Sequence, residues 1–292
     1  MKRAFLDRRQ IMFGRKPDLE IILSRAKQKG FTAVVGRPKM GKTWLLQEVG
    51  RQLHEVGYLE LRTLAQVHQS NDGVQQQLAR SLVNSIIFTK KENDLKRRNE
   101  LLDELCSLGQ LRSHDLELQE FLATALFNSV HFAYEEQNLD VCDALITELK
   151  IMAQTFPNTR RFLTQSLVVS TSHNEKNPSR RGDALNKLRD LVQNHPDDLK
   201  TCEGLANGLF NVHCHALING DLNSAELFLN EMRALARKFP YEPTVLTFFA
   251  RCLTNAIHTV KSTQDLDRQS VLQSELAQVE LKLAKLQRKI SA

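Results

Sequence analysis

Eight consecutive residues, Gly36-Arg37-Pro38-Lys39-Met40-Gly41-Lys42-Thr43, have the spacing of a loop that holds phosphate groups. The segment fits the pattern Gly-x4-Gly-Lys-Ser/Thr, in which backbone N–H groups surround phosphate oxygens. In that chemistry the Lys42 ammonium reaches the β- and γ-phosphates, and the Thr43 hydroxyl binds Mg²⁺. The pattern therefore predicts a site for ATP and magnesium. Its candidate residues are Gly36, Lys39, Gly41, Lys42 and Thr43.

The segments on both sides of this loop have the character that such a site needs. Residues 31–35 (Phe-Thr-Ala-Val-Val) are short, apolar and β-branched, which predicts a buried strand. Residues 44–55 have helical composition, and the positive end of that helix would point at the phosphates. Residues 17–29 predict a helix before the strand, and 58–61 a second strand. The first 65 residues are thus expected to form a small α/β segment.

A second acidic residue, needed for efficient hydrolysis, is missing from the expected place. Phosphate-loop enzymes hold Mg²⁺ and water with an acid at the end of an apolar strand. The three apolar runs that could precede it, 82–83, 86–88 and 167–169, are followed by Asn84, Thr89 and Ser170. A complete nucleoside-triphosphatase core also needs several βαβ units of about 30 residues or more each. We therefore expect nucleotide binding with hydrolysis that is absent or very slow.

The segment Phe13-Gly14-Arg15-Lys16-Pro17-Asp18-Leu19, together with the run 32–46, resembles the opening of bacterial STAND/AAA-type ATPases. The resemblance covers about residues 12–60, and it implies that Gly14 and Arg15 lie near the adenine of ATP. Met12 stands where that family has Phe, and Asp18 where it has Glu. The later features of the family, which are the magnesium-binding acid, the sensor residues and a winged helix, have no counterpart that we can identify.

An internal repeat begins near residue 117. The pattern Leu122-Ala123-x-x-Leu126-Phe127-Asn128 recurs 83 residues later as Leu205-Ala206-x-x-Leu209-Phe210-Asn211, and Phe156-Pro157 recurs as Phe239-Pro240. A weaker copy lies between them and ends at His195-Pro196. A period near 40 with two helical stretches per unit is typical of a helical-hairpin solenoid. We expect four hairpins, at 117–157, 160–196, 199–240 and 244–290.

These patterns predict a mostly α protein, a helical-hairpin solenoid preceded by a small, incomplete α/β phosphate-loop segment. The solenoid is similar to tetratricopeptide-like repeats, although it lacks their 34-residue period and their Trp/Leu-Gly/Tyr pattern. The expected divisions are 1–65 as a partial nucleotide-binding segment, 66–116 as a helical connector, and 117–292 as the solenoid. Within the connector, residues 85–89 could end a strand.

The last expected helix carries an apolar seam at heptad-like spacing, formed by Leu272, Leu276, Val279, Leu283, Leu286 and Ile290. Such a seam is either the closing surface of the solenoid or a pairing surface for a second chain. The pattern of charges beside the seam lacks the opposite pairs that a coiled coil uses. Leu281 lies off the seam and widens it toward the stripe of a packed helix. We favour packing within the chain.

Three further groups of residues give weaker indications of a binding site. His213-Cys214-His215 contains metal-ligand types, but successive helical residues point about 100° apart, which argues against one shared ion. Asn128 and Asn211 occupy matched positions and are expected to bond backbone between hairpins. The basic residues of the N-terminal segment are compatible with nucleic acid. A solvated surface beside a phosphate site is the favoured interpretation, so we expect no nucleic-acid partner.

Charge and composition set limits on the class of protein. Residues 1–51 hold 13 Lys or Arg against 4 Asp or Glu, a net charge of +9, while the other 241 residues carry a net charge of −3. The sequence contains no apolar run long enough to predict a membrane helix or the core of a signal peptide. The five cysteines show no CxxC spacing, which predicts free thiols and a cytoplasmic location.

Two functions of different classes follow. In the first, the chain binds ATP with magnesium, and its repeats hold a protein partner whose identity the sequence does not give. In the second, it is a non-enzymatic repeat scaffold for protein–protein interaction, and its phosphate loop is a remnant. The missing acid favours the second for hydrolysis but does not weigh against binding.

Overall fold

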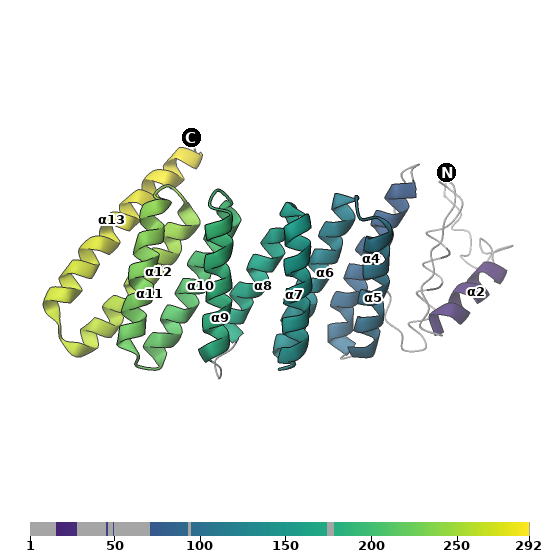
Figure 1. The fold of residues 1–292 in the computed structure, drawn as a ribbon, viewed down its shortest axis with the longest axis horizontal. Helices are drawn as coiled ribbons and strands as arrows, with labels where there is room; N and C mark the ends of the chain where they lie inside the picture. The colour runs from purple at the N-terminus through teal and green to yellow at the C-terminus, as the bar shows by residue number, and fades with distance from the viewer. Residues whose placement is uncertain are drawn as a thin grey trace, which may run out of the picture. The chain divides into compact units, whose positions relative to one another are not determined.

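The computed structural model describes residues 16–27, 45, 49, 71–92, 95–173 and 178–291. Within these ranges it contains eleven α-helices, one short 3-10 helix and no strand (Figure 1). The chain divides into two compact units, Met1–Ser70 and Asn71–Ala292. In the first unit, helix α2 spans Lys16–Lys27. The strands expected at 31–35 and 58–61 lie outside the described residues.

The second unit is a row of five antiparallel helical hairpins (Figure 1). We call the first helix of each hairpin its A helix and the second its B helix. The hairpins are α4 (Asn71–Glu92) with α5 (Leu95–Leu111), α6 (Leu116–Glu135) with α7 (Leu139–Thr155), α8 (Arg160–His173) with α9 (Pro178–Asn194), α10 (Leu199–Ile218) with α11 (Leu222–Lys238), and α12 (Pro243–Thr263) with α13 (Leu266–Ser291).

The helical-hairpin solenoid predicted from the sequence is confirmed, and its four expected hairpins correspond to α6 through α13. The structure adds the hairpin α4–α5, which packs on α6 as the later hairpins pack on one another, so the same stacking extends N-terminal of residue 117. The strand end considered at 85–89 is wrong, because α4 continues through these residues. Ala79, Leu82, Val83 and Ile86 are buried at helical spacing, and that packing holds the segment in a helix.

The two kinds of helix pack differently along the stack. Each A helix packs closely on the A helix of the next hairpin, and each B helix packs closely on its own A helix. The B helices α5, α7, α9 and α11 also pack on the next A helix, whereas the backbones of neighbouring B helices do not come close to one another. The apolar core is one continuous cluster that runs from Ala79 to Val279. Leu126 and Leu209, which the 83-residue repeat predicts to be equivalent, are both fully buried.

The 83-residue repeat also predicts Phe156 and Phe239 to be equivalent buried positions, but both are half-buried. Both residues occupy the position just after a B helix, α7 and α11 respectively, and their backbone N–H groups donate to Met152 and Leu235. The repeat therefore matches their place in the fold, but the end of a helix lies at the margin of the core rather than inside it.

The turn inside the hairpin is also repeated. Gln137 and Gly220 both have left-handed backbone conformations, with φ of 58° and 73°. The residues that follow them, Asn138 and Asp221, cap the next helix, since their side-chain oxygens accept hydrogen bonds from Val141 N–H and Ser224 N–H. Gly220 adopts the left-handed conformation without steric cost, whereas Gln137 does not.

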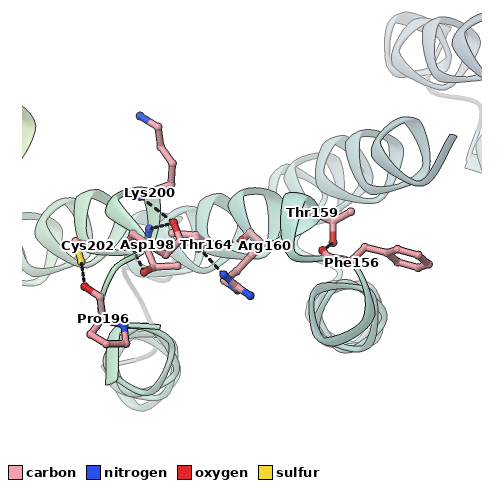
Figure 2. Close-up of polar contacts among 9 residues, drawn as sticks. Phe156, Thr159, Arg160, Thr164, Pro196, Asp198, Lys200 and Cys202 are labelled. Carbon is pink, nitrogen blue, oxygen red and sulfur yellow. Dashed lines mark hydrogen bonds and ion pairs between the residues drawn. The ribbon is translucent and has the colours of Figure 1, made fainter. Parts of the chain in front are cut away.

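Two of the junctions between hairpins are fixed by a capping aspartate. Asp198 caps α10 by accepting from the N–H groups of Lys200 and Thr201, and it also forms an ion pair of 2.8 Å with Arg160 of α8 (Figure 2). Asp115 caps α6 in the same way and is bound by Gln76 of α4. One carboxylate at each of these junctions thus begins a helix and ties it to the preceding A helix.

The seam of α13 packs within the chain from Leu272 to Leu286, and the side chain of Ile290 lies outside the described residues. Leu272 and Val279 are 4% exposed, and Leu276, Leu283 and Leu286 pack on the edge of the core. The outer surface of α12 is polar, since Thr254 stands 44 residues after Phe210 and is exposed. A polar outer surface is what a terminal repeat needs. Among the described hairpins α12–α13 is the last of the stack, and its α12 surface is polar at this position.

Among the described helices, none combines the length and the apolar character that crossing a bilayer requires.

Candidate functional site

The residues predicted to bind nucleotide and magnesium lie outside the described part of the chain. They are Gly14, Arg15, Gly36, Lys39, Gly41, Lys42 and Thr43. The structure does describe their immediate setting on two sides. Helix α2 begins directly after Arg15, and Leu45 follows Thr43 by two residues.

The described residues of the first unit form a small apolar cluster. Leu45 and Val49 are both helical and buried, and they pack with Leu19 and Ile22 of α2, with Leu23 at the edge. Residues four apart lie on one side of a helix, so Leu45 and Val49 define a single buried face. Their positions agree with the apolar side expected for a helix over 44–55.

A second candidate lies on the A helices of the solenoid. The guanidinium of Arg251 on α12 lies 4.7 Å from the ring centroid of Phe210 on α10 and 5.9 Å from that of Phe248 on α12. The two rings are themselves in contact, with centroids 5.7 Å apart. Arg251 is exposed and both phenylalanines are half-buried. We call these three residues the Arg251 cluster.

The sequence analysis did not single out the Arg251 cluster. Phe248 and Arg251 are three residues apart on one helix, and such a pair is common enough to pass unnoticed. The informative signal was the absence of any Asp or Glu between residues 243 and 263, which leaves a basic A helix without an internal counter-charge.

His213, Cys214 and His215 each form a hydrogen bond with a different partner. His213 donates from Nδ1 to the Ala225 carbonyl at 2.9 Å, and His215 Nε2 lies 3.3 Å from the Ser172 carbonyl. Cys214 Sγ accepts a hydrogen bond from Asn255. No group of three or more metal-ligating side chains is found among the described residues. The three adjacent residues are therefore structural contacts of α10.

The role predicted for Asn211 is confirmed. Its side-chain amide donates to Thr171 Oγ1 at 3.0 Å and to the Val168 carbonyl at 3.5 Å, so it joins α10 to α8. Asn255, which the sequence analysis did not note, makes the equivalent bond from α12 to Cys214 of α10. Asn128 occupies the matching, half-buried position on α6. Asn211 and Asn255 therefore belong to the packing between A helices.

The cysteines have the character of inert core thiols. All five are free; Cys142, Cys202 and Cys252 are buried, and Cys106 and Cys214 are half-buried. Burial raises the pKa of Cys142 to about 12, and burial together with Glu148 raises the pKa of Cys106 to about 12. A thiol that stays protonated is a poor nucleophile. Nucleophilic catalysis by these cysteines is therefore disfavoured.

The fold defines the second unit as an α-helical repeat solenoid of stacked hairpins. Comparison with protein-family models, with curated proteins and with solved structures gave no match.

Proposed function

We propose that this chain binds a nucleoside triphosphate with magnesium at residues 36–43 and that its helical repeats hold a protein partner. The observation that carries the nucleotide half is the packing of Leu45 and Val49 on α2 directly after a Gly-x4-Gly-Lys-Thr sequence. It supports a folded helix whose first turn follows the loop. The net charge of +9 over residues 1–51 also favours a polyphosphate ligand.

The roles of the site residues follow from the motif and the resemblance. Lys42 contacts the β- and γ-phosphates, Thr43 binds Mg²⁺, and the loop N–H groups donate hydrogen bonds to the remaining phosphate oxygens. Gly14 and Arg15 lie beside the adenine, as the resemblance to STAND/AAA-type ATPases implies. The sequence supplies no acid at the end of an apolar strand. We therefore propose binding without efficient hydrolysis, with turnover well below about 1 s⁻¹.

The test is titration of the full chain with a fluorescent ATP analogue, with and without Mg²⁺. Lys42→Ala should weaken binding by about tenfold or more, because a charge-assisted hydrogen bond to phosphate is lost. Lys29→Ala, in the same basic segment but outside the loop, is the matched control and should bind as the original chain does. Equal affinity of the original chain and Lys42→Ala would refute the proposed site.

A second candidate function is a non-enzymatic scaffold with a vestigial loop. It is favoured by the missing acid and by the extent of the solenoid, in which five hairpins form one core. If the analogue binds neither the original chain nor Lys42→Ala while circular dichroism shows the helices intact, this second function replaces the first.

A further inference from the structure

Arginines that reach from one hairpin to the next are paired with carboxylates. Seven such pairs are present among the described residues, and their members lie about 40 positions apart in the sequence. They are Arg98–Glu136, Arg160–Asp198, Arg161–Glu120, Arg180–Asp143, Arg189–Glu231, Arg233–Glu275 and Arg268–Glu226. The pairing of cations with the neighbouring repeat is thus a regular feature of this solenoid.

Arg251 of α12, like Arg237 of α11, has no such carboxylate partner among the described residues. The chain supplies two aromatic rings instead, Phe210 from the preceding hairpin and Phe248 from one turn earlier in α12. We propose that the Arg251 cluster is the docking point for an acidic segment of a partner protein.

The geometry of the cluster favours a carboxylate ligand. A guanidinium near aromatic rings is attracted electrostatically to the faces of those rings. Its N–H donors remain available to form two parallel hydrogen bonds with an incoming carboxylate. The contacts with Phe210 and Phe248 also restrict the arginine before binding, which lowers the entropy cost of association. Arginine and aromatic side chains with these properties are the residues that dominate protein interfaces.

The net positive charge of the surrounding A helices indicates that the partner segment is acidic. Helices α8, α10 and α12 carry five Lys or Arg residues and one Glu. Ion pairs already occupy Arg160, Arg161 and Lys200, which leaves Arg251 and Lys261 without a carboxylate among the described residues. A peptide with one or two carboxylates matches this surface. A nucleic acid, whose affinity depends on several phosphate contacts, does not.

The partner segment should also carry apolar side chains. Phe210 and Phe248 are half-buried, and Val168 of the neighbouring α8 is half-buried as well. Apolar residues beside the acidic one would cover this surface and exclude water from the ion pair, which strengthens it. The inferred ligand is therefore an acidic–apolar peptide. This inference rests on the part of the proposed function that gives the repeats a protein partner, and not on nucleotide binding.

The test uses the full chain and short fluorescein-labelled peptides that repeat Glu-Leu-Gly, with matched peptides in which Gln or Lys replaces Glu. Fluorescence polarisation should show binding of the Glu peptide and no binding of the Gln or Lys peptides. Arg251→Gln should weaken it about tenfold, the loss expected for one charge-assisted contact. The matched control is Arg237→Gln, because Arg237 is exposed on the B helix α11 and its loss changes the net charge equally.

Three outcomes would overturn the inference. The first is equal affinity of Arg251→Gln and the original chain, and the second is equal weakening by Arg237→Gln, which would indicate non-specific attraction. The third is Arg251-dependent binding of a single-stranded RNA oligonucleotide in place of the Glu peptide. Lys42→Ala, measured in parallel, should bind the Glu peptide normally. Failure of the nucleotide site would therefore not be mistaken for failure of this one.

Discussion

Arg189 of α9 and Glu231 of α11 are joined by two parallel hydrogen bonds of 2.8 and 2.7 Å, and the same pair recurs 44 residues later as Arg233 and Glu275. Each arginine also donates to an asparagine three residues before it. Neighbouring B helices do not pack directly on one another. Long charged side chains therefore bridge the B helices, while direct helix contact joins the A helices.

The first prediction concerns the energies of these two pairs. The side chains of Arg233 and Glu275 are 20% and 24% exposed, against 35% and 30% for Arg189 and Glu231. Water screens an exposed pair more strongly, so the coupling energy should be larger for Arg233–Glu275. Double-mutant cycles with Arg→Gln and Glu→Gln, read by urea unfolding, should give about 0.5–1 kcal/mol for each pair, with this order. The reverse order would contradict the bridging role inferred for them.

The second prediction concerns the close approach of α10 to the hairpin α8–α9. A Cβ atom on Gly204 would lie 2.0 Å from Thr164 Cγ2, and one on Gly208 would lie 2.7 Å from Leu188 Cδ1. Gly204→Ala should therefore lower the free energy of unfolding by about 1–3 kcal/mol, because the helices must move apart.

Gly182 provides the matched control for this substitution. It lies in α9, and a Cβ atom there would meet nothing within 4 Å. Gly182→Ala should raise the free energy of unfolding by about 0.5–1 kcal/mol, since alanine is the better helix former. Similar effects of the two substitutions on the urea midpoint would mean that Gly204 is not a packing requirement.

The third prediction concerns pH. His213 is 1% exposed between α10 and α11, and its burial lowers its pKa below the usual 6.5. The Ala225 carbonyl, the Cys252 backbone and Glu226 oppose this shift but do not cancel it. The unfolded chain then binds a proton that the folded chain rejects, so the stability that His213 contributes is present above pH 6.5 and is lost as the pH falls below it.

Substitution of His213 isolates this contribution. His213→Val introduces the residue found 83 positions earlier, Val130, which is fully buried in α6. Between about pH 7.5 and 5, the unfolding midpoint of the original chain should fall more than that of His213→Val. Parallel pH profiles for the two proteins would show that another group controls the response to acid.

The fourth prediction concerns the seam of α13. Leu276 and Leu283 pack on the core within the chain, so replacing both with Glu should lower the thermal midpoint markedly and leave the molar mass in solution unchanged. Leu281→Glu is the control, because Leu281 is 58% exposed, and it should have little effect. If the original chain is a dimer and the double variant a folded monomer, the seam is a pairing surface between chains.

The internal repeat predicted the solenoid because every stacked hairpin needs similar residues at the same core and turn positions. Leu126 and Leu209 match since each fills the same place in the core, and the turns at Gln137 and Gly220 match since each needs a left-handed residue. The hairpin α4–α5 was not found in this way. Its core residues satisfy helical spacing without repeating the letters of the later units, and packing constrains spacing and volume more than residue identity.

The two candidate sites were predictable to different extents. The phosphate loop is predicted from a local motif of adjacent residues, and its five candidate residues, like Gly14 and Arg15, lie outside the described residues. The Arg251 cluster joins residues 41 positions apart, and their meeting depends on how α10 packs against α12. Sequence spacing along one helix cannot supply that information.

Because the capping carboxylates Asp115 and Asp198 occupy equivalent positions, the segment 116–198 can be deleted or duplicated as a unit. Each begins an equivalent A helix and is held by a side chain of the hairpin before it, Gln76 in one case and Arg160 in the other. In-frame deletion or duplication of this segment leaves a capped helix and an anchored carboxylate at every new joint. A gene for this protein can therefore change the length of its solenoid by two hairpins in one recombination event, and the new joint keeps its helix cap although it brings together two hairpins that are not neighbours in this chain.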